Sequence, residues 1–167
     1  LLFFKENNVP VIADFSFNII NELSFQKLLE WGTKRITPSF DLNQEQIEKL
    51  CENIPISAVE QIVFGRIPLF TINHCLWRAN IVPKGKPCEQ ICKHTTLKIK
   101  DRRDAIHSVR TDILCRNIIE NAAEYSTKPI NNIKHVRIEW DTRLGNLHKI
   151  IEKIKHGCGG ERIGVRG

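Results

Sequence analysis

Apolar residues change their spacing repeatedly along the first seventy residues, and this alternation constrains the fold more than any other feature. Residues 9–17 alternate apolar and polar positions, as a β-strand does. Ser24 is a suitable N-cap for a helix that ends near Gly32, and residues 34–41 are typical of a second strand.

The pattern then repeats once more. Asp41 or Asn43 can cap an amphipathic helix over residues 42–54, and residues 58–70 return to strand character. Strands that alternate with helices through short connections predict βα units and a parallel sheet, as an α/β barrel or as an open sheet. No glycine-rich loop follows any strand, which disfavours a dinucleotide site.

The regular alternation stops after residue 70. A loop rich in proline, glycine and cysteine is expected at 71–93. Beyond it, the pattern predicts strands at 95–101, 106–112 and 135–141, and helices at 115–125 and 144–157. We therefore expect βα units over 1–70 and a cysteine-bearing segment over 71–167, within one domain.

Four of the six cysteines have a spacing that suggests a metal site. They are separated by 12, 3 and 22 residues: Cys75, Cys88, Cys92 and Cys115. Cys88 and Cys92 would share one face of a helical turn, and the prolines and glycine before them allow the chain to fold back towards Cys75. Four converging thiolates suit zinc or an iron–sulfur cluster.

Other interpretations of these cysteines remain open at this point. Disulfides need an oxidising compartment, and no secretion signal begins this chain. Unrelated buried thiols are common in proteins, and Cys51, on an apolar helix face, is expected to be one. Cys158 is expected to be a free thiol. The three-residue gap is less typical of zinc, but thiolate chemistry alone does not separate zinc from a cluster.

Composition indicates a cytoplasmic globular protein without a membrane segment. The chain is 41% hydrophobic and 26% charged, and no apolar run is long enough to cross a bilayer. Its formal net charge is +6, which permits RNA binding. The densest basic run, KIKDRR at 98–103, contains an acid and no aromatic residue. The chain contains no methionine, so we expect an excerpt of a longer polypeptide.

Several motifs together resemble a known family. EQIVFGRIPLF, HC, PCEQICKH, KDRRDAIHSV and DILCRNIIENA occur in that order and are similar to the collagenase-like peptidase family of unknown catalytic type. The resemblance implies the C-terminal half of a TIM-like (β/α) barrel plus a cysteine-bearing segment. It also implies a [4Fe–4S] cluster, with zinc as the alternative, on Cys75, Cys88, Cys92 and Cys115. The chain departs from the family pattern at DRRDA, which lacks a glycine.

The family name implies a protease, but the residues identify no catalytic group. There is no H-E-x-x-H or G-x-S-x-G motif. Relatives in the family also carry out oxygen-independent hydroxylation of RNA bases or of the ubiquinone ring, so the resemblance permits a peptide, RNA or quinone-precursor substrate. A non-catalytic, metal-stapled assembly protein and an RNA-binding protein are further alternatives.

Candidate substrate contacts come from the strand ends. Arg66 and His74 bracket the last strand before the cysteine loop and are the first choice for binding substrate or an anion. Other polar residues near predicted strand ends are Asp14, Asn18, Thr37, Ser39 and Glu60.

Overall fold

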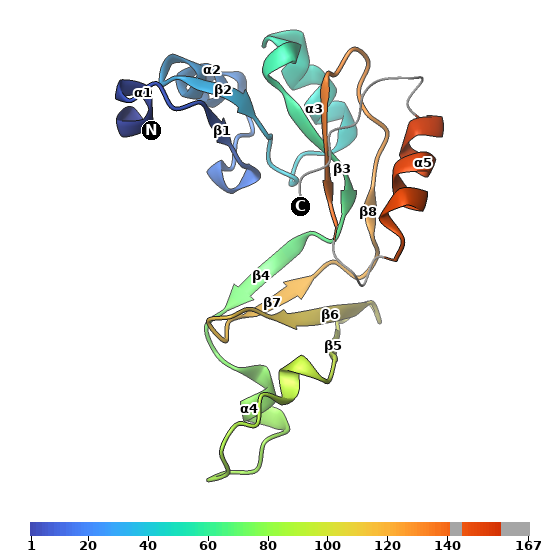
Figure 1. Ribbon diagram of the computed structural model, residues 1–167. Helices are drawn as coiled ribbons and strands as arrows, with labels where there is room; N and C mark the ends of the chain where they lie inside the picture. Colours follow the sequence, from blue (N-terminus) through green and yellow to red (C-terminus); the bar gives the residue numbers. More distant parts are fainter. Residues whose placement is uncertain (141–144, 158–167) are drawn as a thin grey trace. The chain divides into compact units, whose positions relative to one another are not determined.

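The computed structural model describes residues 1–140 and 145–157, and the chain divides into two compact units (Figure 1). The inserted unit is Arg66–Tyr125. The discontinuous unit comprises Leu1–Gly65 and Ser126–Gly167, so the chain leaves it and later returns. Within the described ranges, no helix has the length and apolar character that a bilayer crossing requires.

The discontinuous unit begins with short helices and strands, in the order α1 (Leu2–Glu6), β1 (Val11–Ala13), η1 (Phe15–Phe17), α2 (Glu22–Glu30), β2 (Thr33–Ile36), α3 (Gln44–Glu52) and η2 (Ile56–Ala58). The Asn43 and Gln46 side chains form a reciprocal capping box at the start of α3, which confirms Asn43 as a cap. The helix predicted to end near Gly32 is confirmed as α2, but its predicted N-cap, Ser24, was wrong: the N-cap is Asn21, whose side chain accepts from the backbone N–H of Ser24 at 2.9 Å.

The second sheet of this unit joins segments that are distant in sequence. Strand β3 (Glu60–Gly65) lies between β8 (Tyr125–Ser126) and β9 (His135–Glu139), and it runs parallel to β9. Every residue of β3 is buried, as expected for a central strand. Gly65 ends the strand with φ +152°, where a Cβ would lie 2.6 Å from the backbone oxygen of Glu139.

The predicted TIM-like barrel is wrong. The described residues form a two-stranded sheet (β1-β2, parallel), the three-stranded sheet around β3, and a four-stranded sheet, none of which closes into a barrel. The single strand predicted at 58–70 is in fact two strands in different sheets. Strand β3 ends at Gly65, and the chain then continues into the inserted unit, where β4 begins. The alternation of strands and helices in the first seventy residues therefore does not produce a closed barrel.

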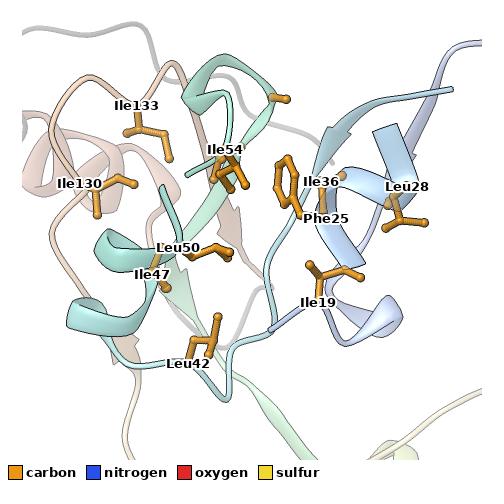
Figure 2. Packing of buried hydrophobic residues seen from close by; sticks show 13 residues of the cluster. Ile19, Phe25, Leu28, Ile36, Leu42, Ile47, Leu50, Ile54, Ile130 and Ile133 are labelled. Carbon is orange, nitrogen blue, oxygen red and sulfur yellow. The ribbon is translucent and has the colours of Figure 1, made fainter. Parts of the chain in front are cut away.

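Two apolar clusters hold the discontinuous unit together. The larger one gathers buried side chains from α2, β2, α3 and the segment before β9; Figure 2 labels Ile19, Phe25, Leu28, Ile36, Leu42, Ile47, Leu50, Ile54, Ile130 and Ile133. The smaller cluster packs helix α5 (Leu147–Gly157) on the sheet, with Leu147, Ile150, Ile151 and Ile154 around Val63, Phe64 and Ile138. The predicted helix at 144–157 is confirmed over α5.

The inserted unit is built on an antiparallel sheet. Its elements are β4 (Pro68–Ile72), α4 (Leu76–Asn80), η3 (Ile91–Lys93), β5 (Leu97–Lys100), β6 (Ile106–Thr111) and β7 (Asn117–Glu120), and the strand order is β4-β7-β6-β5. The hairpin predicted at 95–112 is confirmed. The predicted helix at 115–125 is wrong, because Ile118 and Ile119 pair across to both β4 and β6, and cross-strand packing overrides local propensity.

Candidate metal site

All four predicted thiolate ligands belong to the inserted unit, in segments attached to one end of its sheet. Ile72, the last residue of β4, pairs with Asn117, the first of β7, and Thr111, the last of β6, pairs with Asn117 from the other side. Leu97 begins β5 at this same end, paired with Val109. The end of the sheet defined by these strand termini is called here the cysteine end.

The cysteines occupy the connections at the cysteine end. Cys75 follows β4, Cys88 and Cys92 lie between α4 and β5, and Cys115 lies in the turn between β6 and β7. Segments whose cysteines are 13 to 40 positions apart in sequence thus start or finish at neighbouring strand ends. The topology therefore attaches three segments, which carry the four cysteines, at one end of one small sheet.

Cys75 is the N-cap of α4, and its Sγ accepts a hydrogen bond from the backbone N–H of Arg78 at 3.4 Å. The adjacent backbone is held by Asn117, whose side chain is completely buried. Its Oδ1 accepts from the N–H of Leu76 at 2.6 Å, and its Nδ2 lies 3.4 Å from the hydroxyl of Thr111. Asn117 therefore ties the Cys75 segment to the start of the strand that follows Cys115.

A second set of hydrogen bonds ties α4 to the segment that carries Cys92. Trp77, only 2% exposed, donates from its indole Nε1 to the hydroxyl of Thr95 at 2.9 Å. That hydroxyl donates to the carbonyl of Ile91 at 2.8 Å, one residue before Cys92. Cys92 itself is half-buried in the single turn of η3, whereas Cys88 is exposed outside it, so the predicted shared helical turn is wrong.

Cys115 lies at the tip of a tight turn and has a left-handed backbone, φ +59°. The carboxylate of Asp112 organises this turn by accepting from the N–H groups of Leu114 and Arg116, each at 2.9 Å. The Cys115 thiol is exposed. A left-handed residue other than glycine or asparagine is uncommon and is a reason to look for a role at this position.

The structure attaches the three cysteine-bearing segments at one sheet end but does not bring the thiols into coordination distance. In the part of the chain that it describes, no three His, Cys, Asp or Glu side chains form a group that could hold a metal ion. The five described cysteines are also free of disulfides. The set of four ligands therefore stays a prediction. Two observations fit it: all four residues carry thiol groups, and their segments are attached at the same end of the sheet.

Cys51 lies apart from this group, on α3 in the discontinuous unit. Burial, with a smaller contribution from the nearby Glu48 carboxylate, raises the pKa of its thiol to about 11. This environment agrees with the expected half-buried structural thiol and disfavours the thiolate that a metal requires. Cys158 lies outside the described residues.

Arg66 and His74, the predicted substrate contacts, are not brought together. They flank the five-residue strand β4, so roughly 17 Å separates its two ends. Arg66 lies at the end remote from the cysteines, where its guanidinium Nη1 is 3.4 Å from the hydroxyl of Ser108, while His74 is exposed beside Cys75. A substrate role for either residue stays a prediction.

Three of the polar residues predicted at strand ends form an ion-pair network in the discontinuous unit. Glu60, 5% exposed, accepts from the hydroxyl of Thr37 at 3.2 Å and lies 3.6 Å from Arg35 and 3.9 Å from Arg137. Arg137 also pairs with Asp14 and, at 2.5 Å, with Glu139. Because the arginines of this network are paired with its carboxylates, the network fits a structural role. It links β1, β2, β3 and β9.

The sequence analysis overlooked Asn117, Trp77 and Thr95, which hold the cysteine-bearing segments. Asn117 was assigned to a helix, where a buried asparagine has no evident partner. Two features could have identified these residues. An asparagine two positions after a candidate ligand can serve as its hydrogen-bonding support, and a tryptophan in a polar loop needs a buried position and an acceptor.

Comparison with known proteins does not support the family resemblance. No family model matches the chain, and no solved structure matches it. The chain is similar to Protein Ycf2 of Anthoceros angustus, with 24% identity over 160 residues. This alignment covers 91% of the chain and 7% of the relative, so the chain spans a small fraction of the protein it matches. The assignment to the collagenase-like peptidases was therefore wrong.

Proposed function

We propose that the inserted unit, Arg66–Tyr125, is a non-catalytic binding module whose loops are fastened by a metal centre with four thiolate ligands, Cys75, Cys88, Cys92 and Cys115. The observation that carries this proposal is the arrangement of the sheet, in which the three segments that carry all four cysteines are attached at the cysteine end. Metal binding would close these connections over the end of the sheet.

The small size of the inserted unit supports a metal centre that stabilises its fold. The inserted unit has 60 residues, a size at which one apolar core supplies little stability. Among residues 66–125, all of which the structure describes, the buried apolar side chains are Ile67, Trp77 and Val109. Large apolar residues at the cysteine end, Ile113 at 98% exposed and Leu114 at 68%, lie outside this core. A metal centre is one of the usual ways in which a unit of this kind gains stability.

The peptidase and hydroxylase activities followed from the resemblance alone, and the proposed function includes neither. Without the resemblance, zinc and a [4Fe–4S] cluster are again equal choices, because both accept four thiolates. The four ligands leave no open coordination position for a substrate, which suits a structural centre more than a Lewis acid.

The test is anaerobic purification of the whole chain, followed by metal and sulfide analysis and an absorption spectrum. We expect either about four irons with matching sulfide and a brown colour, or about one zinc without colour. Cys115→Ser should lose this metal, whereas Cys51→Ser, the matched control in the other unit, should retain it. Absence of metal, or metal that persists equally in both variants, would contradict the proposal.

A further inference from the structure

The positive charge of this chain is concentrated in the inserted unit. Residues 66–125 contain eleven lysines and arginines and six acidic residues, so they carry five of the six net charges. The remaining residues are almost neutral. A net charge confined to a 60-residue unit gives that unit a strong electrostatic attraction for anions.

Most of this charge lies on the hairpin of β5 and β6, called here the basic hairpin (Leu97–Thr111). Lys98 pairs with Ser108 and Lys100 with Ile106, so both lysines are on one face of the hairpin, and both are exposed. Arg110, on the same face, is exposed as well. Arg102 and Arg103 lie exposed in the turn, at the end of the sheet opposite the cysteine end.

The distal half of the basic hairpin is a two-stranded ribbon. The ladder between β6 and β7 runs only from Val109 to Thr111, whereas the ladder between β5 and β6 continues to Lys100 and Ile106. The strands of a ribbon lie about 4.8 Å apart. With its side chains, such a ribbon matches the major groove of B-form DNA, which is about 12 Å wide and admits a two-stranded β-ribbon.

The turn of the basic hairpin is ordered by its own acid. The carboxylate of Asp101 accepts from the N–H groups of Arg103 at 2.7 Å and Ala105 at 2.9 Å. The backbone N–H of Asp101 also donates to the carbonyl of Ala105 at 2.9 Å. The two arginine side chains are therefore displayed on a preformed turn, which lowers the entropic cost of binding.

Some of the charge is already compensated and some is not. Lys100 pairs with Asp104 at 2.5 Å and Arg110 with Glu120 at 3.2 Å. No ion pair with another described residue engages Lys98, Arg102 or Arg103. These three cations are the ones available to a phosphate backbone.

The composition of the hairpin favours nucleic acid over an acidic protein. A protein interface needs an apolar or aromatic centre, and residues 97–111 include no aromatic residue, with Ile106 the exposed large apolar one. Interfaces with nucleic acid are more polar and more positive. The lack of aromatics also disfavours single strands, which bind by stacking of bases.

We propose that the basic hairpin is a docking surface for double-stranded DNA, with the turn entering the major groove and Lys98, Arg102 and Arg103 contacting phosphates. Phosphate contacts carry no sequence information, so binding is expected to be independent of base sequence and to weaken steeply as salt rises. The turn of the basic hairpin, which carries Arg102 and Arg103, lies at the opposite end of the sheet from the proposed metal centre.

The experiment measures binding of the whole chain to a fluorescently labelled DNA duplex of mixed sequence over a range of salt. The triple variant Lys98→Gln, Arg102→Gln, Arg103→Gln should bind at least about 10-fold more weakly and lower the salt slope by about 2 to 3. The control, Lys34→Gln, Lys49→Gln, Lys134→Gln, removes equal charge from exposed positions of the other unit and should bind within about 2-fold of wild type.

A gain of binding provides an independent check. Asp104→Asn removes the acid that pairs with Lys100, at a left-handed position that asparagine tolerates, and should tighten binding by about 2- to 3-fold. Equal weakening by both triple variants would overturn the proposal. Tighter binding of duplex RNA or of polyglutamate than of duplex DNA would also overturn it and identify those polyanions as the better fit.

Discussion

The side chain of Asn117 accepts a hydrogen bond from the backbone N–H of Leu76 at 2.6 Å and so joins the segment after Cys75 to the strand that follows Cys115. Asn117 is completely buried, and the hydrogen bond is part-buried. It ties together two connections that carry predicted ligands 40 residues apart in sequence.

Asn117→Ala should destabilise the inserted unit by about 1 to 3 kcal/mol, because the partly buried N–H of Leu76 loses its acceptor and the buried side-chain amide is removed. It should also lower the metal affinity of the cysteine end. Hydrogen exchange at the β6 and β7 amides measures the first effect, and metal competition measures the second. Asn80→Ala is the matched control, since this exposed asparagine bonds only to the Leu76 carbonyl of its own helix. Equal protection in both variants would contradict the assigned role.

Gly65 should not tolerate a side chain. Gly65→Ala forces a Cβ against the backbone of Glu139 at a φ of +152°, so we expect a loss of about 2 kcal/mol or more in thermal unfolding. Gly85 also has a positive φ, +81°, but an added Cβ there would meet open space. Gly85→Ala should therefore lower the free energy of unfolding by only about 1 kcal/mol. If Gly85→Ala lost more stability than Gly65→Ala, the close approach of β3 and β9 would not be the reason that Gly65 is required.

Glu60→Gln should destabilise the discontinuous unit by about 1 to 3 kcal/mol. The amide retains an acceptor for Thr37 but removes the negative charge that two partly buried arginines, Arg35 and Arg137, require. Urea unfolding measures the change. Glu52→Gln, at the exposed end of α3, should differ from wild type by less than about 0.5 kcal/mol. The network would be shown to be unimportant if the two variants were equally stable.

The contribution of Asp101 should depend on pH. Hydrogen bonds from the N–H of Arg103 and then of Ala105 lower the pKa of this carboxyl below its ordinary value of 3.8. A lowered pKa in the folded state means that the carboxylate stabilises the hairpin above the unfolded pKa and that this stabilisation disappears as pH falls through the folded pKa. Asp101→Asn should therefore be less stable than wild type near pH 7.

The two proteins should converge at acidic pH, as the pH falls through the folded-state pKa of Asp101 and the wild-type carboxyl becomes protonated. Urea unfolding followed by circular dichroism at both pH values tests this expectation. A difference that stays constant or grows on acidification would mean that the backbone N–H groups of Arg103 and Ala105 do not favour the charged form.

Local elements were predicted well where short-range interactions decide the structure. The capping box at Asn43 and the strands of the 95–112 hairpin follow from neighbouring residues alone, and both are confirmed. Residues 115–125 were assigned to a helix because their local composition permits one. Their strand conformation comes from pairing with residues more than 40 positions earlier, which no local pattern contains.

The sequence proposed the donors of the candidate site but did not indicate which residues support them. Cysteine spacing drew attention to Cys75, Cys88, Cys92 and Cys115, whereas their attachment to one end of a sheet emerged from strand order. The pairing of Ile72 and Thr111 with Asn117 creates that end.

The sequence by itself determined the local structure of this protein: where α3 and α5 form and where the hairpin turns. It also determined which cysteines are candidates for a metal site and how basic the chain is. These properties depend on interactions within a few residues or on composition. The tertiary structure decided that β3 pairs with β9, which follows it in sequence only after the whole inserted unit, and that the sheets stay open. It also decided that the three cysteine-bearing segments share one sheet end. Such features depend on which distant segments bury one another, and that choice is made by the packing of the folded chain as a whole.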